Sequence, residues 1–319
     1  MLRTGLSNYV PCNHAVLKAN NKEDNVPTLY VVATPIGNLK DLSPRAQEIL
    51  SSVGLIAAED TRVTRALLSH FEIHTPCVSN HRHNEEEKAQ PIVQRMLEED
   101  IDCALVTDAG TPAISDPGSF LVDEALRAGI PVVAVPGPTA MAAALSVSGF
   151  DTRTFAFYGF LPRKRSELVR QLKDIQQSGI PIAVVHESPH RVIELVEVIC
   201  TALPGCRISA SCDLTKFYEK TIRGTAQEVL EMLRSNEKAE KGEYCLVLDL
   251  HDVLQEESAE RADQSAEVQL FEKMLAGMDL KSAIAALREG GMKRNEAYQA
   301  GERIKQLFED NFEAGEDES

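Results

Sequence analysis

Charged side chains follow directly after several short apolar runs in this chain. Glu59-Asp-Thr-Arg62 follows one such run, Asp108 follows another, and Glu187-Ser-Pro-His-Arg191 follows a third. Carboxylates at such positions can act as general bases, and arginines can hold an anionic group. A plainer interpretation also fits, because Asp60, Thr61 or a Ser-Pro pair can cap the start of a helix. We therefore expect these segments either to form polar active-site loops or to begin helices.

Three loops rich in Gly and Pro carry almost no long side chains: Thr34–Asn38, Asp108–Gly118 and Pro136–Thr139. For any one of them a simple tight turn is explanation enough. However, each follows an apolar run that we interpret as a strand, and parallel sheets bind ligands beyond the carboxyl ends of their strands. Gly allows a close backbone approach and Pro stiffens the loop. Together the loops predict a cofactor cleft that offers backbone groups to a flat, polar small molecule.

Several common signatures are missing. The sequence has no G-x-G-x-x-G after the first apolar run, no G-x-x-x-x-G-K-[ST] and no G-x-S-x-G. Their absence disfavours a dinucleotide site, a P-loop and an α/β-hydrolase. His81 and His83 have no clear third ligand beside them, and Cys200, Cys206 and Cys212 lack a paired histidine. We therefore expect no metal site and interpret 81–85 as a polar loop.

Apolar runs alternate with helical patterns through the first half of the chain. Strands are predicted at 29–33, 53–58, 103–107 and 130–135, with helices beginning at Ser43-Pro44 and near Asp60 and a small-residue helix over 140–148. Buried strands that alternate with helices indicate a largely parallel sheet covered by helices. The predicted fold class is therefore α/β.

A second set of elements follows the break at Gly149–Arg153. Strands are predicted at 154–158, 180–185, 207–212 and 243–249, with helices from Arg163, over 188–203 and over 225–233. Their clearer hydrophobic alternation favours a mixed sheet. The complete predicted division is a disordered leader 1–27, an N-terminal α/β domain 28–150, a C-terminal α/β domain 151–250, a linker 251–268, a helical appendage 269–308 with two helical patterns separated by Gly290-Gly291, and a disordered acidic tail 309–319.

The composition limits the class of protein. The 319 residues are about twice a typical ~150-residue domain, and their net charge of −16 disfavours a uniformly basic nucleic-acid surface. Residues 153–173 nevertheless hold six basic residues and one acidic residue, a local net charge of +5. The absence of a long apolar stretch and of a secretory signal, with seven cysteines and no C-x-x-C pair, leads us to expect a cytoplasmic protein without a membrane span.

A series of motifs, in this order, resembles a known family. The matching stretches are L-Y-V-V-A-T-P-I-G-N-L (29–39), L-I-A-A-E-D-T-R (55–62), H-x-H-N-E (81–85), V-T-D-A-G-T-P (106–112), S-D-P-G (115–118), P-G-P-T-A (136–140), G-F-L-P (159–162), E-S-P-H-R (187–191), L-T-K (214–216) and K-G-E (241–243). The chain resembles the class III, tetrapyrrole-methylase-type methyltransferases that depend on S-adenosylmethionine. More narrowly, it is similar to those that methylate a cytidine 2′-hydroxyl in 16S rRNA of the small ribosomal subunit.

The resemblance implies two α/β domains with the cofactor in the cleft between them, and a homodimer. It places S-adenosylmethionine against residues of both domains: Pro35, Ile36, Gly37, Asp108, Ala109, Gly110, Thr111, Thr139, Ala140, Leu214 and Gly242. Three residues of the second domain depart from the family pattern, with Tyr158 in place of Glu, His186 in place of Tyr and Cys212 in place of Arg. These departures concern substrate contacts more than cofactor binding.

A methyl transfer to a ribose hydroxyl needs that oxygen, the methyl group and the sulfur in line, and a base or a cation can assist it. Four candidates for this assistance are Glu59, Asp60, Glu187 and Lys216, and none is singled out as the base. The cations expected to hold RNA phosphates are Arg62, Arg163, Lys164, Arg165, Arg191 and Lys216.

Two other functions remain open from the sequence. The same fold could methylate a tetrapyrrole, although the basic stretch 153–173 and the helical appendage disfavour that substrate. The departures in the second domain would also suit a non-catalytic ribosome-assembly factor. For RNA binding, the charge distribution predicts modest, salt-sensitive affinity for naked RNA and a folded ribosomal surface as the partner.

Overall fold

The computed structural model describes residues 26–255 and 265–313. The predicted leader 1–27 lies almost wholly outside these residues, as do much of the predicted linker and the last six residues of the predicted tail. The chain divides into two compact units, residues 1–249 and 250–319, and each is described by itself.

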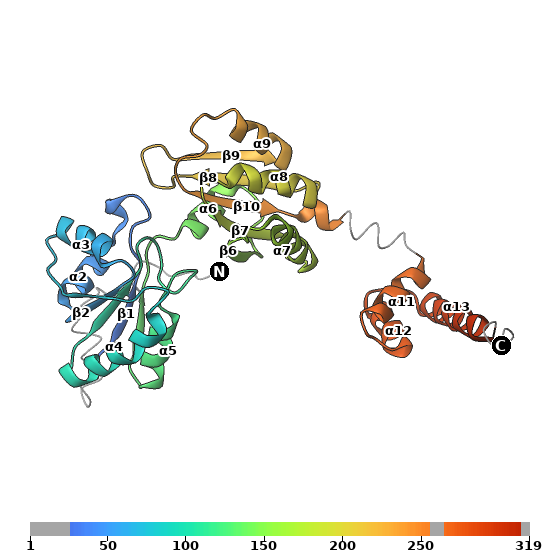
Figure 1. Cartoon of the computed structure of the whole chain (residues 1–319), viewed down its shortest axis with the longest axis horizontal. Helices are drawn as coiled ribbons and strands as arrows, with labels where there is room; N and C mark the ends of the chain where they lie inside the picture. The colour runs from blue at the N-terminus through green and yellow to red at the C-terminus, as the bar shows by residue number, and fades with distance from the viewer. Residues whose placement is uncertain (1–25, 256–264, 314–319) are drawn as a thin grey trace, which may run out of the picture. The chain divides into compact units, whose positions relative to one another are not determined.

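The first sheet contains five parallel strands in the order β3-β2-β4-β1-β5, of which Figure 1 labels β1 and β2. The strands are β1 (Leu29–Val32), β2 (Leu55–Ala58), β3 (Cys77–Ser79), β4 (Cys103–Val106) and β5 (Val132–Val135). Sequence patterns predict all of these except β3, a three-residue edge strand whose residues are only half-buried and show no burial alternation. Because every strand runs the same way, the loops after β1, β2, β4 and β5 reach the same edge.

Helices cover both faces of this sheet, as the sequence predicts. They are the short 3₁₀ helix η2 (Leu39–Asp41) and the α-helices α2 (Pro44–Ser52), α3 (Thr61–His70), α4 (Glu85–Glu99) and α5 (Ser119–Arg127). Tyr30 and Val32 pack with α2 and α3, whereas Leu29 packs with α4 and α5. The predicted start of α2 is confirmed, because the Ser43 side chain accepts a hydrogen bond from the Ala46 amide and Pro44 begins the helix.

The second sheet is mixed, in the order β6-β7-β10-β8-β9. Its strands are β6 (Ala156–Phe160), β7 (Ile182–Glu187), β8 (Arg207–Cys212), β9 (Lys220–Thr225) and β10 (Tyr244–Asp249). Strands β6 and β7 are parallel, and the other neighbours are antiparallel. Helices α7 (Arg165–Gln177), α8 (Val192–Ala202) and α9 (Ala226–Arg234) accompany it, so the predicted α/β class with one parallel and one mixed sheet is confirmed.

Helix α6 (Ala140–Ser148) precedes the predicted domain boundary but packs on the second sheet. Its Ala144 and Leu145 share a buried cluster with Val184 and Val247 of the central strands. Gly149 then ends the helix in the left-handed conformation, with φ of 65°. The chain therefore enters the second sheet's core one helix earlier than the break in the sequence pattern indicates.

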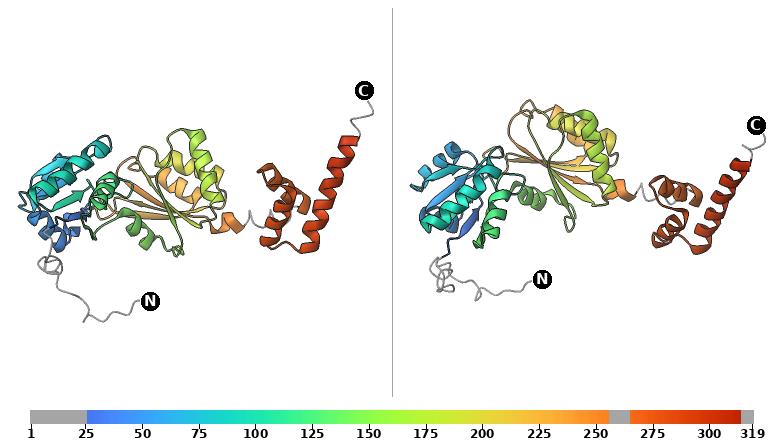
Figure 2. Two further views of the ribbon diagram at one scale, coloured as in Figure 1. Left: turned by 90° about the horizontal axis from the view of Figure 1, so that it is seen from below. Right: turned by 60° about the horizontal axis from the view of Figure 1, so that its bottom comes forward.

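Within the C-terminal unit, described residues 265–313 form three helices, where the sequence pattern predicts two. They are α11 (Ala266–Leu275), α12 (Leu280–Glu289) and the long α13 (Arg294–Glu313), drawn in red in Figure 2. Gly277, with φ of 96°, breaks the first pattern, and the Asp279 side chain caps α12. Helix α11 begins inside the predicted linker, and α13 continues five residues into the predicted acidic tail.

Candidate active site

Two Gly- and Pro-rich loops are joined at the carboxyl edge of the first sheet. The Thr34 amide donates to the Gly110 carbonyl at 2.8 Å, and the Gly110 amide donates back at 3.1 Å. The Thr34 hydroxyl also donates to the Thr107 carbonyl at 3.0 Å. Gly110 has φ of 90°, a conformation that a residue with a side chain rarely adopts. The loops after β1 and β4 thus form one rigid platform of backbone groups.

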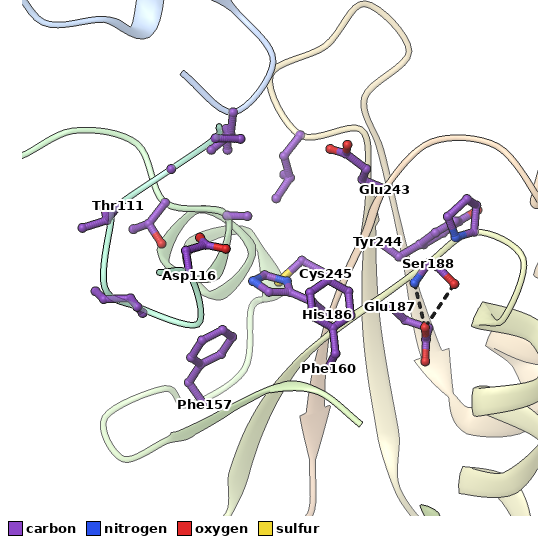
Figure 3. A pocket seen from close by; sticks show the side chains of 18 residues that line it. Thr111, Asp116, Phe157, Phe160, His186, Glu187, Ser188, Glu243, Tyr244 and Cys245 are labelled. Carbon is purple, nitrogen blue, oxygen red and sulfur yellow. Dashed lines mark hydrogen bonds between the residues drawn. The ribbon is translucent and has the colours of Figure 1, made fainter. Parts of the chain in front are cut away.

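A cavity of about 380 Å³ lies against this platform and is also lined by the second sheet (Figure 3). Its lining comprises Ile36, Ala109, Gly110, Thr111, Ile114, Asp116, Thr139, Ala140, Phe157, Phe160, His186, Glu187, Ser188, Pro189, Leu214, Glu243, Tyr244 and Cys245. Seven of the eleven predicted cofactor residues are in this set. The other four, Pro35, Gly37, Asp108 and Gly242, are sequence neighbours of lining residues.

Aromatic rings form one end of the cavity. The His186 ring lies 5.1 Å from the Phe157 ring and 5.7 Å from the Phe160 ring, measured between centroids. Phe160 is 65% exposed, which is unusual for so large an apolar side chain. Burial lowers the pKa of His186, so its imidazole is neutral near pH 7. A neutral imidazole is a group that can accept a proton.

Two carboxylates in the lining have different surroundings. Burial, together with the charges of Glu59 and Asp108, raises the pKa of Asp116 to about 6. Glu187 is buried, and its Oε1 accepts hydrogen bonds from the amide of Ser188 at 2.7 Å and its hydroxyl at 3.3 Å. Figure 3 shows both Ser188 contacts. Asp116 lies in the Asp108–Gly118 loop that the sequence predicts for the cofactor cleft, but it was not among the residues predicted to contact the cofactor.

The other acidic candidates hold loops together. Glu59 Oε2 accepts from the Thr107 hydroxyl at 2.5 Å, and Asp108 Oδ1 accepts from the Asp60 amide at 3.0 Å. The Asp60 carboxylate binds the Arg62 guanidinium and caps α3, and these hydrogen bonds lower the pKa of Asp60 to about 2. Burial raises the pKa of Asp108. Glu59 and Asp60 stay outside the cavity lining, and Asp60 fulfils the capping role that the sequence left open.

Lys216 lies in the loop between β8 and β9 and is held by two carboxylates. Its ammonium is 2.9 Å from Glu243 and 3.3 Å from Asp213. Burial disfavours the charged form, but the two carboxylates outweigh this effect and raise the pKa of Lys216. A Cβ on Gly37 would lie only 2.5 Å from the Lys216 Cγ. The loop after β1 and the Lys216 loop are therefore in close contact.

The predicted RNA-facing cations differ in exposure. The Arg62 side chain is 86% exposed, and Arg163, Lys164 and Arg165 are exposed around the start of α7. Arg191, in contrast, is half-buried; it donates to the Pro162 carbonyl at 3.0 Å and lies 3.4 Å from Glu187 Oε1. The structure thus places four of these cations on the surface and directs Arg191 inward.

Among residues 26–255 and 265–313, no group of three His, Cys, Asp or Glu side chains is arranged to hold a metal ion. Over the same ranges, every helix is too short or too polar to cross a bilayer.

Comparison with known proteins identifies the family. A model described as Tetrapyrrole (Corrin/Porphyrin) Methylases matches residues 28–230. Ribosomal RNA small subunit methyltransferase I of Vibrio cholerae is 38% identical over 281 residues, covering 87% of this chain and 95% of that protein. The protein of the same name from Xylella fastidiosa is 44% identical over 222 residues, covering 69% of this chain and 81% of that protein. The chain belongs to the tetrapyrrole methylase family. Within this family it groups with the ribosomal RNA small subunit methyltransferases I, which confirms the resemblance seen in its motifs.

Solved structures of tetrapyrrole methylase type share the fold. Diphthine synthase matches with a TM-score of 0.54 and 15% identity, covering 72% of this chain and 93% of that one. The methyltransferase CobJ matches with a TM-score of 0.52 and 16% identity, covering 70% of this chain and 95% of that one. At such identities the likeness concerns the fold alone. Membership of the tetrapyrrole methylase family makes the protein a methyltransferase that uses S-adenosylmethionine.

The cavity residues fit this cofactor. The space beside Gly110 is open. A Cβ placed on Gly110 would have Ile36 Cγ2 as its nearest neighbour, at the ordinary contact distance of 3.5 Å, so the platform leaves room for a ligand there. Asp116, whose pKa is about 6, supplies negative charge at neutral pH, which suits a molecule that carries a sulfonium and an ammonium group. When bound, S-adenosylmethionine supplies an activated methyl group. The chain's own residues then have to exclude water and orient the methyl acceptor.

Proposed function

We propose that this protein methylates the 2′-hydroxyl of a cytidine in 16S rRNA, within the small ribosomal subunit and as a homodimer. The relatives' names support a ribosomal RNA substrate in the small subunit. The observation that carries the proposal for this chain is the exposed Phe160 at the cavity mouth, close in sequence to three exposed cations, Arg163, Lys164 and Arg165. An aromatic ring beside clustered cations is the combination that binds single-stranded RNA.

The charge of this surface differs from that of the whole chain. The net charge is −16 overall, yet residues 153–173 carry +5. Cations hold RNA phosphates, whereas an unstacked base packs on an aromatic ring. A cytidine whose base lies on Phe160 would bring its ribose to the cavity, with the neighbouring phosphates near the start of α7. This arrangement supports an RNA substrate over a tetrapyrrole.

The acceptor hydroxyl needs a proton acceptor within the cavity. Glu59 and Asp60 lie outside the lining, and Lys216 is charged and bound to two carboxylates. The lining groups that can accept a proton include His186, whose imidazole is neutral, and the carboxylates of Asp116, with its pKa raised to about 6, and Glu187. We propose that one of these three assists the transfer and that Lys216 positions the loop beside Gly37.

The test is methyl transfer from labelled S-adenosylmethionine to purified small subunits, to naked 16S rRNA and to a porphyrinogen. We expect 2′-O-methylcytidine in nucleoside digests of the rRNA, with more product from subunits than from naked RNA. Methylation of a base instead of ribose would contradict the proposal, as would product only with the porphyrinogen. Absence of product with both RNA substrates, despite cofactor binding in calorimetry, would also contradict it.

The homodimer is tested separately by analytical ultracentrifugation. We expect a mass of twice the 35.0 kDa chain at micromolar concentration. A monomer at the concentrations that give full activity would contradict this part of the proposal and leave the substrate unaffected.

A further inference from the structure

A second cavity of about 460 Å³ lies beside β8, β9 and α9. It is lined by Ala210, Cys212, Asp213, Tyr218, Lys220, Ile222, Met232, Leu233, Asn236, Lys238, Lys241 and Tyr244. Ile222, Met232 and Leu233 give it an apolar part, and Tyr244 also lines the cofactor cavity. The two cavities therefore share a side chain at the first residue of β10.

The second cavity is positively charged. Lys220, Lys238 and Lys241 line it, and in the part of the chain that the structure describes none of them has an ion-pair partner. Asp213 is the carboxylate of this lining, and Lys216 lies 3.3 Å from it. Three lysines against one carboxylate give the lining a net positive charge. Such a site favours an anionic ligand.

Two exposed aromatic residues stand in the loop between β8 and β9. Tyr218 lines the cavity and is 74% exposed, and Phe217 beside it is 92% exposed. The Lys238 ammonium lies 5.5 Å from the centroid of the Tyr218 ring, so a cation and an aromatic face meet at the same place. Exposed rings of this size are uncommon on a surface that binds nothing. A ring face with adjacent lysines matches a base joined to a phosphate.

We propose that the second cavity binds one nucleotide of the RNA substrate, with its base on Tyr218 and its phosphate among the three lysines. This inference rests on the proposed function. The ligand is an RNA residue and not a free nucleotide, because the loop that carries Tyr218 also carries Leu214 of the cofactor cavity, and Tyr244 lines both sites. One RNA strand can therefore place one nucleotide in each cavity. The nucleotide in the second cavity would determine which nucleotide of the RNA reaches the methyl group.

The experiment measures binding of a fluorescein-labelled single-stranded oligocytidylate to the full-length protein by fluorescence anisotropy. We expect Tyr218→Ala to weaken binding about tenfold, since stacking of one base is worth that order, and Tyr218→Phe to retain it. We expect Lys238→Ala with Lys241→Ala to weaken binding and to reduce its salt dependence. Lys88→Ala with Lys281→Ala, which removes two exposed lysines on α4 and α12, is the charge-matched control and should bind like the wild type.

Three outcomes would overturn the inference. The first is unchanged oligonucleotide affinity in both the tyrosine and the lysine variants. The second is binding of free cytidine monophosphate as tight as that of the oligonucleotide. The third is dissociation of a dimer by Tyr218→Ala in ultracentrifugation, which would make this loop an interface between copies of the chain.

Methylation assays separate this inference from the proposed function. If the wild type methylates small subunits and Tyr218→Ala raises KM for RNA with S-adenosylmethionine affinity unchanged, both stand. If the wild type methylates small subunits and Tyr218→Ala has an unchanged KM, only the nucleotide site is wrong. If the wild type binds the cofactor but neither binds nor methylates RNA, the proposed function is wrong, and the nucleotide site that rests on it is wrong as well.

Discussion

Replacing Arg191 with methionine tests whether this residue supports the site from within or binds RNA. Its guanidinium lies 3.4 Å from Glu187 Oε1 and donates to the Pro162 carbonyl. The Glu187 side chain is 1% exposed and that of Arg191 is 20% exposed. Arg191 also stands at the N-cap of α8, where the helix dipole disfavours a cation. Its presence there is explained by the buried carboxylate that it neutralises.

The expected cost follows from this burial. Removing one partner of a buried ion pair costs about 3–5 kcal/mol, because the remaining charge is left in a medium that solvates it poorly. Arg191 retains some solvent contact, and Ser188 still donates two hydrogen bonds to Glu187. We therefore expect Arg191→Met to lower the free energy of unfolding by about 2–3 kcal/mol.

The assay is urea denaturation followed by circular dichroism, for each single variant and for the double variant with Glu187→Gln. Neutralising the carboxylate should recover part of the loss, so we expect a coupling energy of about 1–2 kcal/mol. Arg163→Met, at an exposed position near α7, should change stability by less than about 0.5 kcal/mol. Arg191→Met with wild-type stability and weakened RNA binding would refute this reasoning and make Arg191 an RNA contact.

Three further changes probe the loops and the cavity. Gly37→Ala places a Cβ 2.5 Å from the Lys216 Cγ, so the two loops would have to move apart. We expect the affinity for S-adenosylmethionine, measured by calorimetry, to fall about tenfold. An affinity equal to that of the wild type would argue against this contact. Gly242→Ala combines φ of 90° with a Cβ 2.6 Å from Asp213, and urea denaturation should show a loss of about 1–3 kcal/mol. The folded pKa of Asp116 is raised from 3.8 to about 6, so its carboxylate destabilises the fold as pH rises through this interval. The melting temperature of Asp116→Asn minus that of the wild type should therefore increase from about pH 4 to about pH 7. A difference that does not change with pH would contradict the raised pKa of Asp116.

Much of the fold could be predicted from local patterns. Strand β8 and helix α6 have the bounds that their sequences indicate, and Ser43-Pro44 begins α2 as expected. These features depend on residues close together in the chain, through period-two alternation or a cap within one helical turn. Strand β3 was missed because its three residues carry too little pattern, and its pairing with β2 depends on a distant segment.

The candidate site was predicted only in part, for a related reason. The Gly- and Pro-rich loops indicated a cofactor cleft, and Ile36 and Gly110 do line the cavity. Phe157 and Phe160 line it as well, but they come from a separate segment whose convergence with these loops depends on how the two sheets meet. Their own sequences give no sign of where they point.

The sequence by itself determined the alternation of strands and helices, the parallel first sheet and the family, because each follows from short-range patterns and ordered motifs. Only the tertiary structure decided which charged residues face inward. Arg163 and Arg191 each stand beside a helix start, yet Arg163 is exposed and Arg191 neutralises a buried carboxylate. The difference lies in long-range packing, which sets burial and hence the free energy of every charge, and no local pattern records it.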